Sequence, residues 1–205
     1  MIRHRLSLEE FQALLEKAPE GLRLELLDGE VYEMAPIGSG HASLVTYLTK
    51  QLERLYGDRA LAYVQNPLRL SPHYLPQPDL ALLRPREDFY RERLPEAGDT
   101  LLVVEVSFST REMDLKKLAL YAQGGVPEVW LVEEGGSLEA YREPRGDRYR
   151  HRLLVEPGEE VAPLLLSHPP LLWDPPRGTP PRERMETFTP SSRLRRKTET
   201  TLPST

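Results

Sequence analysis

Cysteine is absent from this chain of 205 residues. Without thiols, the protein has no disulfide framework, no thiolate metal site and no cysteine nucleophile. The sequence also lacks an apolar run near the roughly 18 residues of a transmembrane helix, and its N-terminus lacks the apolar segment of a signal peptide. We therefore expect a cytoplasmic protein that makes no membrane contact.

An excess of positive charge is missing as well. The formal net charge is −5, so any contact with nucleic acid must be local rather than a general coating. The charge is uneven, because residues 174–205 carry a net +3 and residues 1–173 a net −8. The positive segment is rich in Pro, Ser and Thr, and it has few large apolar residues. We predict one domain over 1–173 and a disordered tail over 174–205.

Two widespread catalytic motifs are also absent. No Gly-x-Ser-x-Gly sequence occurs, which argues against a serine hydrolase with a nucleophile elbow. The segment Gly38-Ser39-Gly40 lacks the further glycine of a dinucleotide-binding loop, so nucleotide cofactors are not indicated.

The apolar pattern that is present predicts an α/β domain. Ser7 and Glu10 form a capping-box pattern at the start of one helix, and Asp28-Gly29 is a two-residue hairpin signal. A strand, helix, strand order over 101–132 predicts a parallel crossover. The predicted helices are 7–17, 41–56 and 112–123, and the predicted strands are 22–27, 30–34, 61–64, 68–70, 80–83, 101–107, 128–132, 137–141 and 149–155, with a turn at 144–147.

Strand 101–107 is apolar except at Glu105 and Ser107. Period-two alternation places Leu101, Val103, Glu105 and Ser107 on one face of this strand. A carboxylate inside such a strand costs several kcal/mol unless a cation or hydrogen-bond donors compensate it. Asp79 is a candidate neighbour, because it opens strand 80–83 directly after a proline. Two converging carboxylates favour a divalent-metal site that can hydrolyse phosphodiesters.

The helix after this strand carries two adjacent lysines. Lys117 shares its face with Met113 and Tyr121, so we expect it to lean inward along apolar surface. Lys116 can instead pair with Glu112 at the surface. We take Lys117 as the functional lysine, and the alternative is that both are ordinary surface lysines.

Several short motifs, in order along the chain, resemble the Uma-type family of restriction-endonuclease-like proteins, a branch of the PD-(D/E)XK nuclease superfamily. The resemblance covers about residues 7–172 and implies a central mixed β-sheet flanked by helices, with Mg²⁺ or Mn²⁺ bound at Asp79 and Glu105 and DNA as the substrate. The matching segments are Glu25-Leu26-Leu27-Asp28-Gly29-Glu30, Met34-Ala35-Pro36, His41, Pro78-Asp79, Val104-Glu105-Val106-Ser107, Ser109-Thr110-Arg111, Asp114, Lys117 with Tyr121, and Gly125-Val126-Pro127-Glu128-Val129-Trp130.

The resemblance also implies supporting residues. Glu25 matches the family's early acid and could complete the metal shell, or it is a surface carboxylate of the hairpin. His41 could act as a general base or contact phosphate, or it is a capping or packing residue. Gln77 is a candidate to orient water. The superfamily pattern has a lysine where Ser107 stands, and the resemblance implies that Lys117 takes over its role.

We therefore predict an endodeoxyribonuclease that depends on Mg²⁺ or Mn²⁺ and hydrolyses a phosphodiester with metal-activated water. Asp79 and Glu105 would bind the metal, and Lys117 would stabilise charge. A homodimer or higher homo-oligomer is expected from the need to cut two strands. Two alternatives stay open: a catalytically inert nuclease-fold module for binding or assembly, and a structural ion triad of the two acids with Lys117 that needs no metal.

Overall fold

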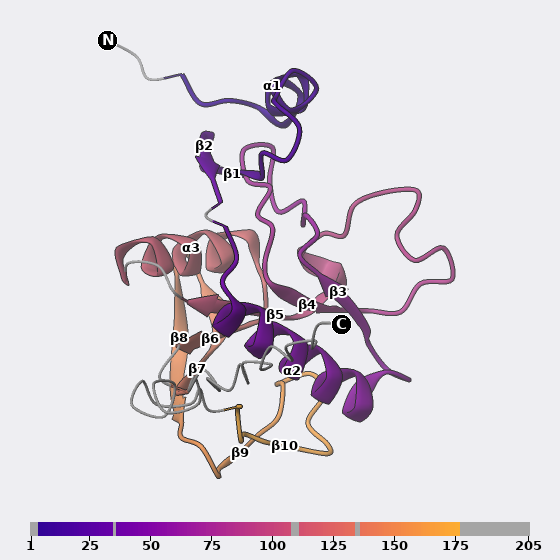
Figure 1. The fold of residues 1–205 in the computed structure, drawn as a ribbon, viewed down its shortest axis with the longest axis vertical. Coiled ribbons are helices and arrows are strands. Elements are labelled where there is room, and N and C mark those ends of the chain that lie inside the picture. The colour runs from indigo at the N-terminus through magenta and orange to yellow at the C-terminus, as the bar shows by residue number, and fades with distance from the viewer. Residues whose placement is uncertain (1–3, 35, 108–110, 134–135, 177–205) are drawn as a thin grey trace, which may run out of the picture.

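The computed structural model describes residues 4–34, 36–107, 111–133 and 136–176 (Figure 1). The predicted tail lies outside these residues from 177 onward. The helices are α1 (Leu8–Leu15), α2 (Ser39–Tyr56), the 3₁₀ helix η1 (Ala97–Asp99) and α3 (Arg111–Gly124). The strands are β1 (Leu24–Leu27), β2 (Glu30–Glu33), β3 (Leu61–Val64), β4 (Leu80–Leu83), β5 (Thr100–Ser107), β6 (Glu128–Glu133), β7 (Leu138–Arg145), β8 (Arg148–Val155), β9 (Glu160–Val161) and β10 (Leu171–Leu172).

A six-stranded mixed sheet with helices on both faces forms the centre of the fold. Its strand order is β3-β4-β5-β6-β7-β8, and β5 and β6 are parallel and joined through α3. Helix α2 packs on one face of the sheet and α3 on the other (Figure 1). This architecture confirms the predicted fold class and the predicted crossover.

The N-terminal hairpin lies beside the main sheet rather than in it. Asp28 and Gly29 have φ angles of 55° and 76°, the left-handed conformations that a tight two-residue hairpin turn requires. Leu26 bridges to Leu75, and the buried side chains of Leu8 and Phe11 from α1 pack in the same cluster. Helix α1 begins at the predicted capping box of Ser7 and Glu10. The hairpin is therefore anchored on a small core of its own.

Three local predictions were wrong. Residues 68–70 form no strand, because the backbone N–H groups of Leu68 and Leu70 donate to the nearby carbonyls of Pro76 and Tyr74, and that of Arg69 donates to the carbonyl of Pro95. The turn before β8 is shorter than 144–147, because Pro144 and Arg145 still pair with that strand. Leu101 packs with the α2-side core, because the β4–β5 register shifts between Leu82 and Leu83 and breaks the alternation there.

None of the helices that the structure describes is both long and apolar enough to cross a bilayer.

Candidate active site

The pairing of β4 with β5 brings two carboxylates together at one end of the sheet. Leu80 pairs with Val104, so Asp79, one residue earlier in the antiparallel ladder, lies across from Glu105. The backbone N–H of Val106 donates to Asp79 Oδ2 at 2.9 Å, which ties the carboxylate of Asp79 directly to β5. The ladder itself therefore sets the position of both acids.

Glu105 is held through one of its two carboxylate oxygens. The hydroxyl of Tyr121 donates to Glu105 Oε1 at 2.6 Å, and Lys117 Nζ donates to the same oxygen at 3.3 Å. The side chain is 12 % exposed. Burial raises the pKa of Glu105 to about 7, with Lys117 opposing the rise and Asp79 adding to it. At neutral pH the site therefore holds an acid near its titration point.

Asp79 is held in a similar way. Its Oδ2 accepts the N–H of Val106 and lies 3.0 Å from Nε2 of His41, at the start of α2. Among the described residues, its Oδ1 has one long contact, of 3.5 Å with Gln65 Nε2. The hydrogen bond to Asp79 raises the pKa of His41, and burial opposes that rise. His41 is thus placed to orient Asp79.

Lys117 links the sheet to the hairpin. Its Nζ lies 2.9 Å from Glu25 Oε1 and 3.3 Å from Glu105 Oε1. Burial lowers the pKa of Lys117, but the carboxylates of Glu105 and Glu25 outweigh burial and hold the pKa above its usual value. The backbone N–H of Gln77 donates to the other oxygen of Glu25 at 3.3 Å. Both oxygens of Glu25 are therefore engaged by the protein.

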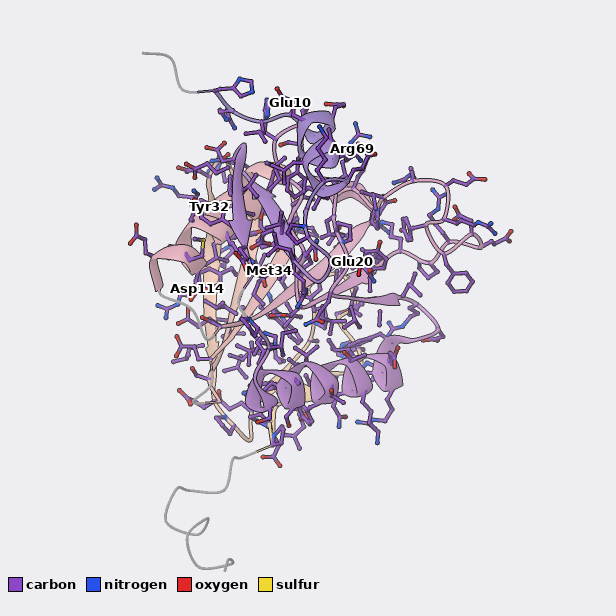
Figure 2. The ribbon with its side chains drawn as sticks, turned by 45° about the horizontal axis from the view of Figure 1, so that its top comes forward. Glu10, Glu20, Tyr32, Met34, Arg69 and Asp114 are labelled. Atoms are coloured by element: carbon purple, nitrogen blue, oxygen red, sulfur yellow. The ribbon has the colours of Figure 1, made fainter. Side chains whose placement is uncertain are left out.

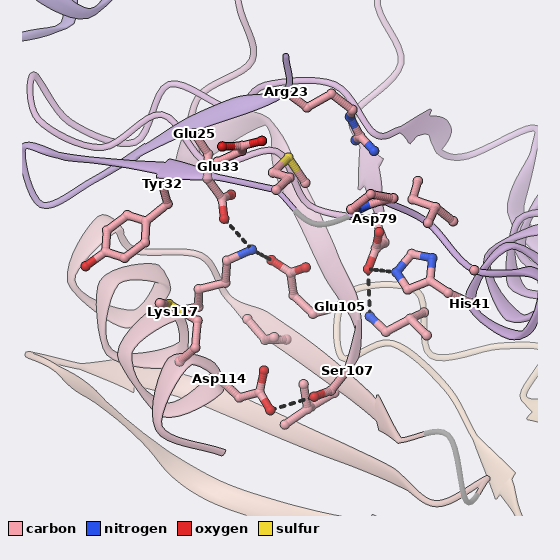
Figure 3. A pocket seen from close by; sticks show the side chains of 18 of the residues that line it. Arg23, Glu25, Tyr32, Glu33, His41, Asp79, Glu105, Ser107, Asp114 and Lys117 are labelled. Carbon is pink, nitrogen blue, oxygen red and sulfur yellow. Dashed lines mark hydrogen bonds and ion pairs between the residues drawn. The ribbon is translucent and has the colours of Figure 1, made fainter. Parts of the chain in front are cut away.

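One cavity of about 730 Å³ is lined by the side chains of Glu25, His41, Asp79, Glu105 and Lys117 (Figure 3). The start of α2 from Gly38 to His41 forms part of the wall. Ser107 also lines it and donates to Asp114 Oδ2 at 2.6 Å. Tyr32 of β2, Met34 just after β2 and Asp114 of α3 also line the cavity, and Figure 2 labels these three residues. The cavity is thus walled by the hairpin, α2, α3 and the sheet.

The donor set fits a hard divalent cation of the Mg²⁺ type. No described residue donates a hydrogen bond to Glu105 Oε2, and Asp79 Oδ1 has only the long contact with Gln65. Within the described ranges, no group of three or more His, Cys, Asp or Glu side chains is placed to hold a metal ion. Mg²⁺ is commonly bound by one or two carboxylates together with water and substrate phosphates, which two open carboxylate oxygens can satisfy.

The structure brings together most of the residues singled out in the sequence. Asp79, Glu105, Lys117, Glu25, His41 and Ser107 all line the cavity. Gln77 is not among the lining residues, and its side chain donates to the carbonyl of Leu24 at 3.1 Å. Gln77 therefore holds β1 in place and does not line the cavity.

Two contacts of α3 were not foreseen. Lys116 bonds Glu30 Oε2 and the hydroxyl of Tyr32, each at 2.6 Å, instead of pairing with Glu112. The hydroxyl of Tyr121 donates to Glu105, whereas the sequence pattern placed Tyr121 on the same helical face as Lys117 and predicted no contact with Glu105. Its position four residues after Lys117, on the same helical face, was the available signal.

A mixed sheet between helices, with paired acids and a lysine at one sheet end, defines a protein with a restriction-endonuclease-like fold. The chain belongs to the Uma2 family, described as "Putative restriction endonuclease", which matches residues 8–169. This match confirms the family that the motifs indicated.

A solved structure has the same fold. It is a crystal structure of a "putative nuclease belonging to DUF820" from Anabaena variabilis ATCC 29413, which superposes with a TM-score of 0.66 at 18 % sequence identity. The similarity covers 82 % of this chain and 94 % of that chain. No curated protein matches the sequence.

Proposed function

We propose that the protein is an endonuclease that uses Mg²⁺ or Mn²⁺ to hydrolyse phosphodiester bonds of DNA. The observation that carries the proposal is the placement of Asp79 across from Glu105, with Lys117 bonded to Glu105, in one cavity. Membership of the family supports the nuclease activity. The metal, the substrate and the roles below are parts of the proposal.

In this proposal each side chain has one task. Asp79 and Glu105 hold the cation, which when bound supplies the positive charge that activates water and neutralises the phosphodiester. His41 and the N–H of Val106 orient Asp79. Lys117 presents a permanent positive charge that can bind the scissile phosphate.

The charge of the cavity explains why a cation would be required. Among the described residues that line it, the carboxylates are Glu25, Glu33, Asp79, Glu105 and Asp114, and the basic side chains are Arg23, His41 and Lys117. A DNA phosphate entering such an acidic cavity is repelled unless a cation offsets the carboxylates. We therefore expect DNA to bind productively at this site only when a divalent metal is present.

Cleavage of supercoiled plasmid tests the proposal. The purified protein is incubated with Mg²⁺, Mn²⁺ or chelator, beside Asp79→Ala and Lys117→Ala. Asp58→Ala and Lys50→Ala are matched controls, because both positions are exposed and neither lines the cavity. We expect metal-dependent cleavage that both site variants lose and both controls keep. Linear product would indicate paired sites, as in the predicted homodimer, whereas nicked circles would indicate single cuts.

One observation favours a second candidate. Lys117 bridges Glu25 and Glu105 at ion-pair distance, so these three residues can also form a structural triad in a binding module without turnover. The two candidates differ in metal uptake, which calorimetry measures directly. No heat of Mn²⁺ binding together with no plasmid cleavage would favour the inert module.

A further inference from the structure

We propose that Tyr121 is the positioning residue of the metal site, because its buried hydroxyl holds Glu105 Oε1 and so would leave Oε2 available to a cation. This inference rests on the proposed metal-dependent function and names a residue to which that function assigned no task.

The hydroxyl of Tyr121 is fixed from several directions. The side chain is fully buried, in the core that joins α3 to the sheet. Its ring packs against that of Tyr74, with centroids 5.7 Å apart. A tyrosine held by such packing has little rotamer freedom, so the 2.6 Å bond to Glu105 Oε1 restrains the carboxylate at low entropic cost.

The two acids of the site are restrained alike. Glu105 is bonded through Oε1, and Asp79 is bonded mainly through Oδ2 by His41 and Val106. Figure 3 shows the contacts of Asp79 with His41 and of Glu105 with Lys117. Outer contacts of this kind orient metal ligands, and their loss typically lowers metal affinity tenfold to a hundredfold.

Lys117 contacts the same oxygen but is less suited to this task. Its Nζ is closer to Glu25, at 2.9 Å, than to Glu105, at 3.3 Å. It is also the group proposed to bind the phosphate. Because Tyr121 makes the shorter bond, Lys117 can turn to the phosphate while Glu105 keeps its orientation. Tyr121 thus orients the metal ligand Glu105, and Lys117 remains available to stabilise charge on the phosphate.

The test compares Tyr121→Phe with Tyr74→Phe by calorimetric titration with Mn²⁺. Both rings are buried and pack against each other in a tilted arrangement. Among the described residues the Tyr74 hydroxyl makes no hydrogen bond of full geometry, although an interaction with Tyr121 acts on its pKa, and it does not bond Glu105. Each variant removes one oxygen atom from the same core. We expect Tyr121→Phe to weaken Mn²⁺ binding about tenfold or more, and Tyr74→Phe to stay within about twofold of the unaltered protein. Equal Mn²⁺ affinity in the unaltered protein and Tyr121→Phe would overturn the inference.

Lys117→Met gives a second measurement that does not depend on how Tyr121→Phe folds. This change removes the other donor to Oε1 together with a positive charge near the cation. We expect Mn²⁺ affinity to be kept or increased. A tenfold loss in Lys117→Met would assign the positioning to Lys117 and contradict the inference. Absence of Mn²⁺ binding in the unaltered protein would instead overturn the proposed metal site, and the role of Tyr121 with it.

Discussion

Two glutamates in neighbouring parallel strands, one fully buried and one partly buried, have different sets of hydrogen-bond partners. Glu128 in β6 is fully buried. Its Oε1 accepts from Trp130 Nε1 at 2.7 Å and from Arg142 Nε at 2.8 Å, and its Oε2 accepts the N–H of Leu164. Glu105 in β5 accepts hydrogen bonds from the described residues through Oε1 and not Oε2, and it lines a cavity.

The difference separates a structural acid from a candidate functional one. Every oxygen of Glu128 has a partner, and Arg142 also reaches the carbonyl of Ala162 at 2.6 Å, so this acid joins the sheet to the segment that follows β8. Glu105 keeps one oxygen for a ligand and has its pKa raised to about 7. An incompletely bonded buried acid, more than burial itself, is what indicates a site.

The largest effect should come from Glu105→Gln. We expect plasmid cleavage to fall at least about a thousandfold, because a neutral amide binds Mg²⁺ or Mn²⁺ poorly. Stability to urea should be kept or increased, because the cost of burying a carboxylate disappears. Initial cleavage rates and urea midpoints check both results. Glu128→Gln should show the reverse pattern, with unaltered Mn²⁺ affinity and lower stability. If Glu105→Gln still cleaved plasmid, the assignment of Glu105 as the functional acid and Glu128 as the structural acid would be wrong.

Arg142→Met should give the largest loss of stability. It leaves Glu128 buried without its cation, and breaking a buried pair in this way costs about 3–5 kcal/mol. Urea denaturation measures the loss. Arg150→Met is the matched control, because Arg150 is 55 % exposed and makes a surface pair with Glu143 at 3.4 Å. A loss below about 1 kcal/mol for Arg142→Met would mean that the Glu128 network is not the structural element we describe.

The pKa of Glu105 predicts a pH dependence. The folded protein keeps the proton of Glu105 up to pH about 7, whereas an unfolded glutamate releases it near pH 4.5. The stability of the metal-free protein should therefore fall as pH rises through this interval. Mn²⁺ affinity should rise by up to about tenfold per pH unit until pH about 7. Titrations between pH 5 and pH about 8 test this, and Glu105→Gln should lose this part of the stability change.

The smallest effect is expected at the hairpin. Lys116 bonds Glu30 and lies over the ring of Tyr32 at 4.8 Å, about one-third exposed to solvent. Lys116→Ala should lower stability by less than about 1 kcal/mol. Thermal unfolding against Lys50→Ala measures it. A larger loss of stability, together with weaker plasmid cleavage, would show that the contact of Lys116 with the hairpin is also needed for activity at the site.

Local features of the fold could be predicted because they depend on near neighbours in the chain. The capping box of Ser7 and Glu10, the Asp28-Gly29 turn and the period-two pattern around Glu105 are set within a few residues. Segment 68–70 could not be predicted in the same way, because its backbone bonds to Tyr74, Pro76 and the more distant Pro95 replace the pairing that its strand-like apolar pattern indicated.

By itself, the sequence determined the mixed α/β architecture, the family, and the grouping of Asp79, Glu105 and Lys117, because apolar periodicity and ordered motifs carry that information. The tertiary structure alone decided the partners: Lys117 bonds Glu25, Lys116 bonds Glu30, and Tyr121 bonds Glu105. The two lysine contacts join elements far apart in the chain, and the Tyr121 contact depends on how α3 packs back on β5. The same long-range packing completes the hydrogen bonds of one buried glutamate and leaves the other with an open oxygen.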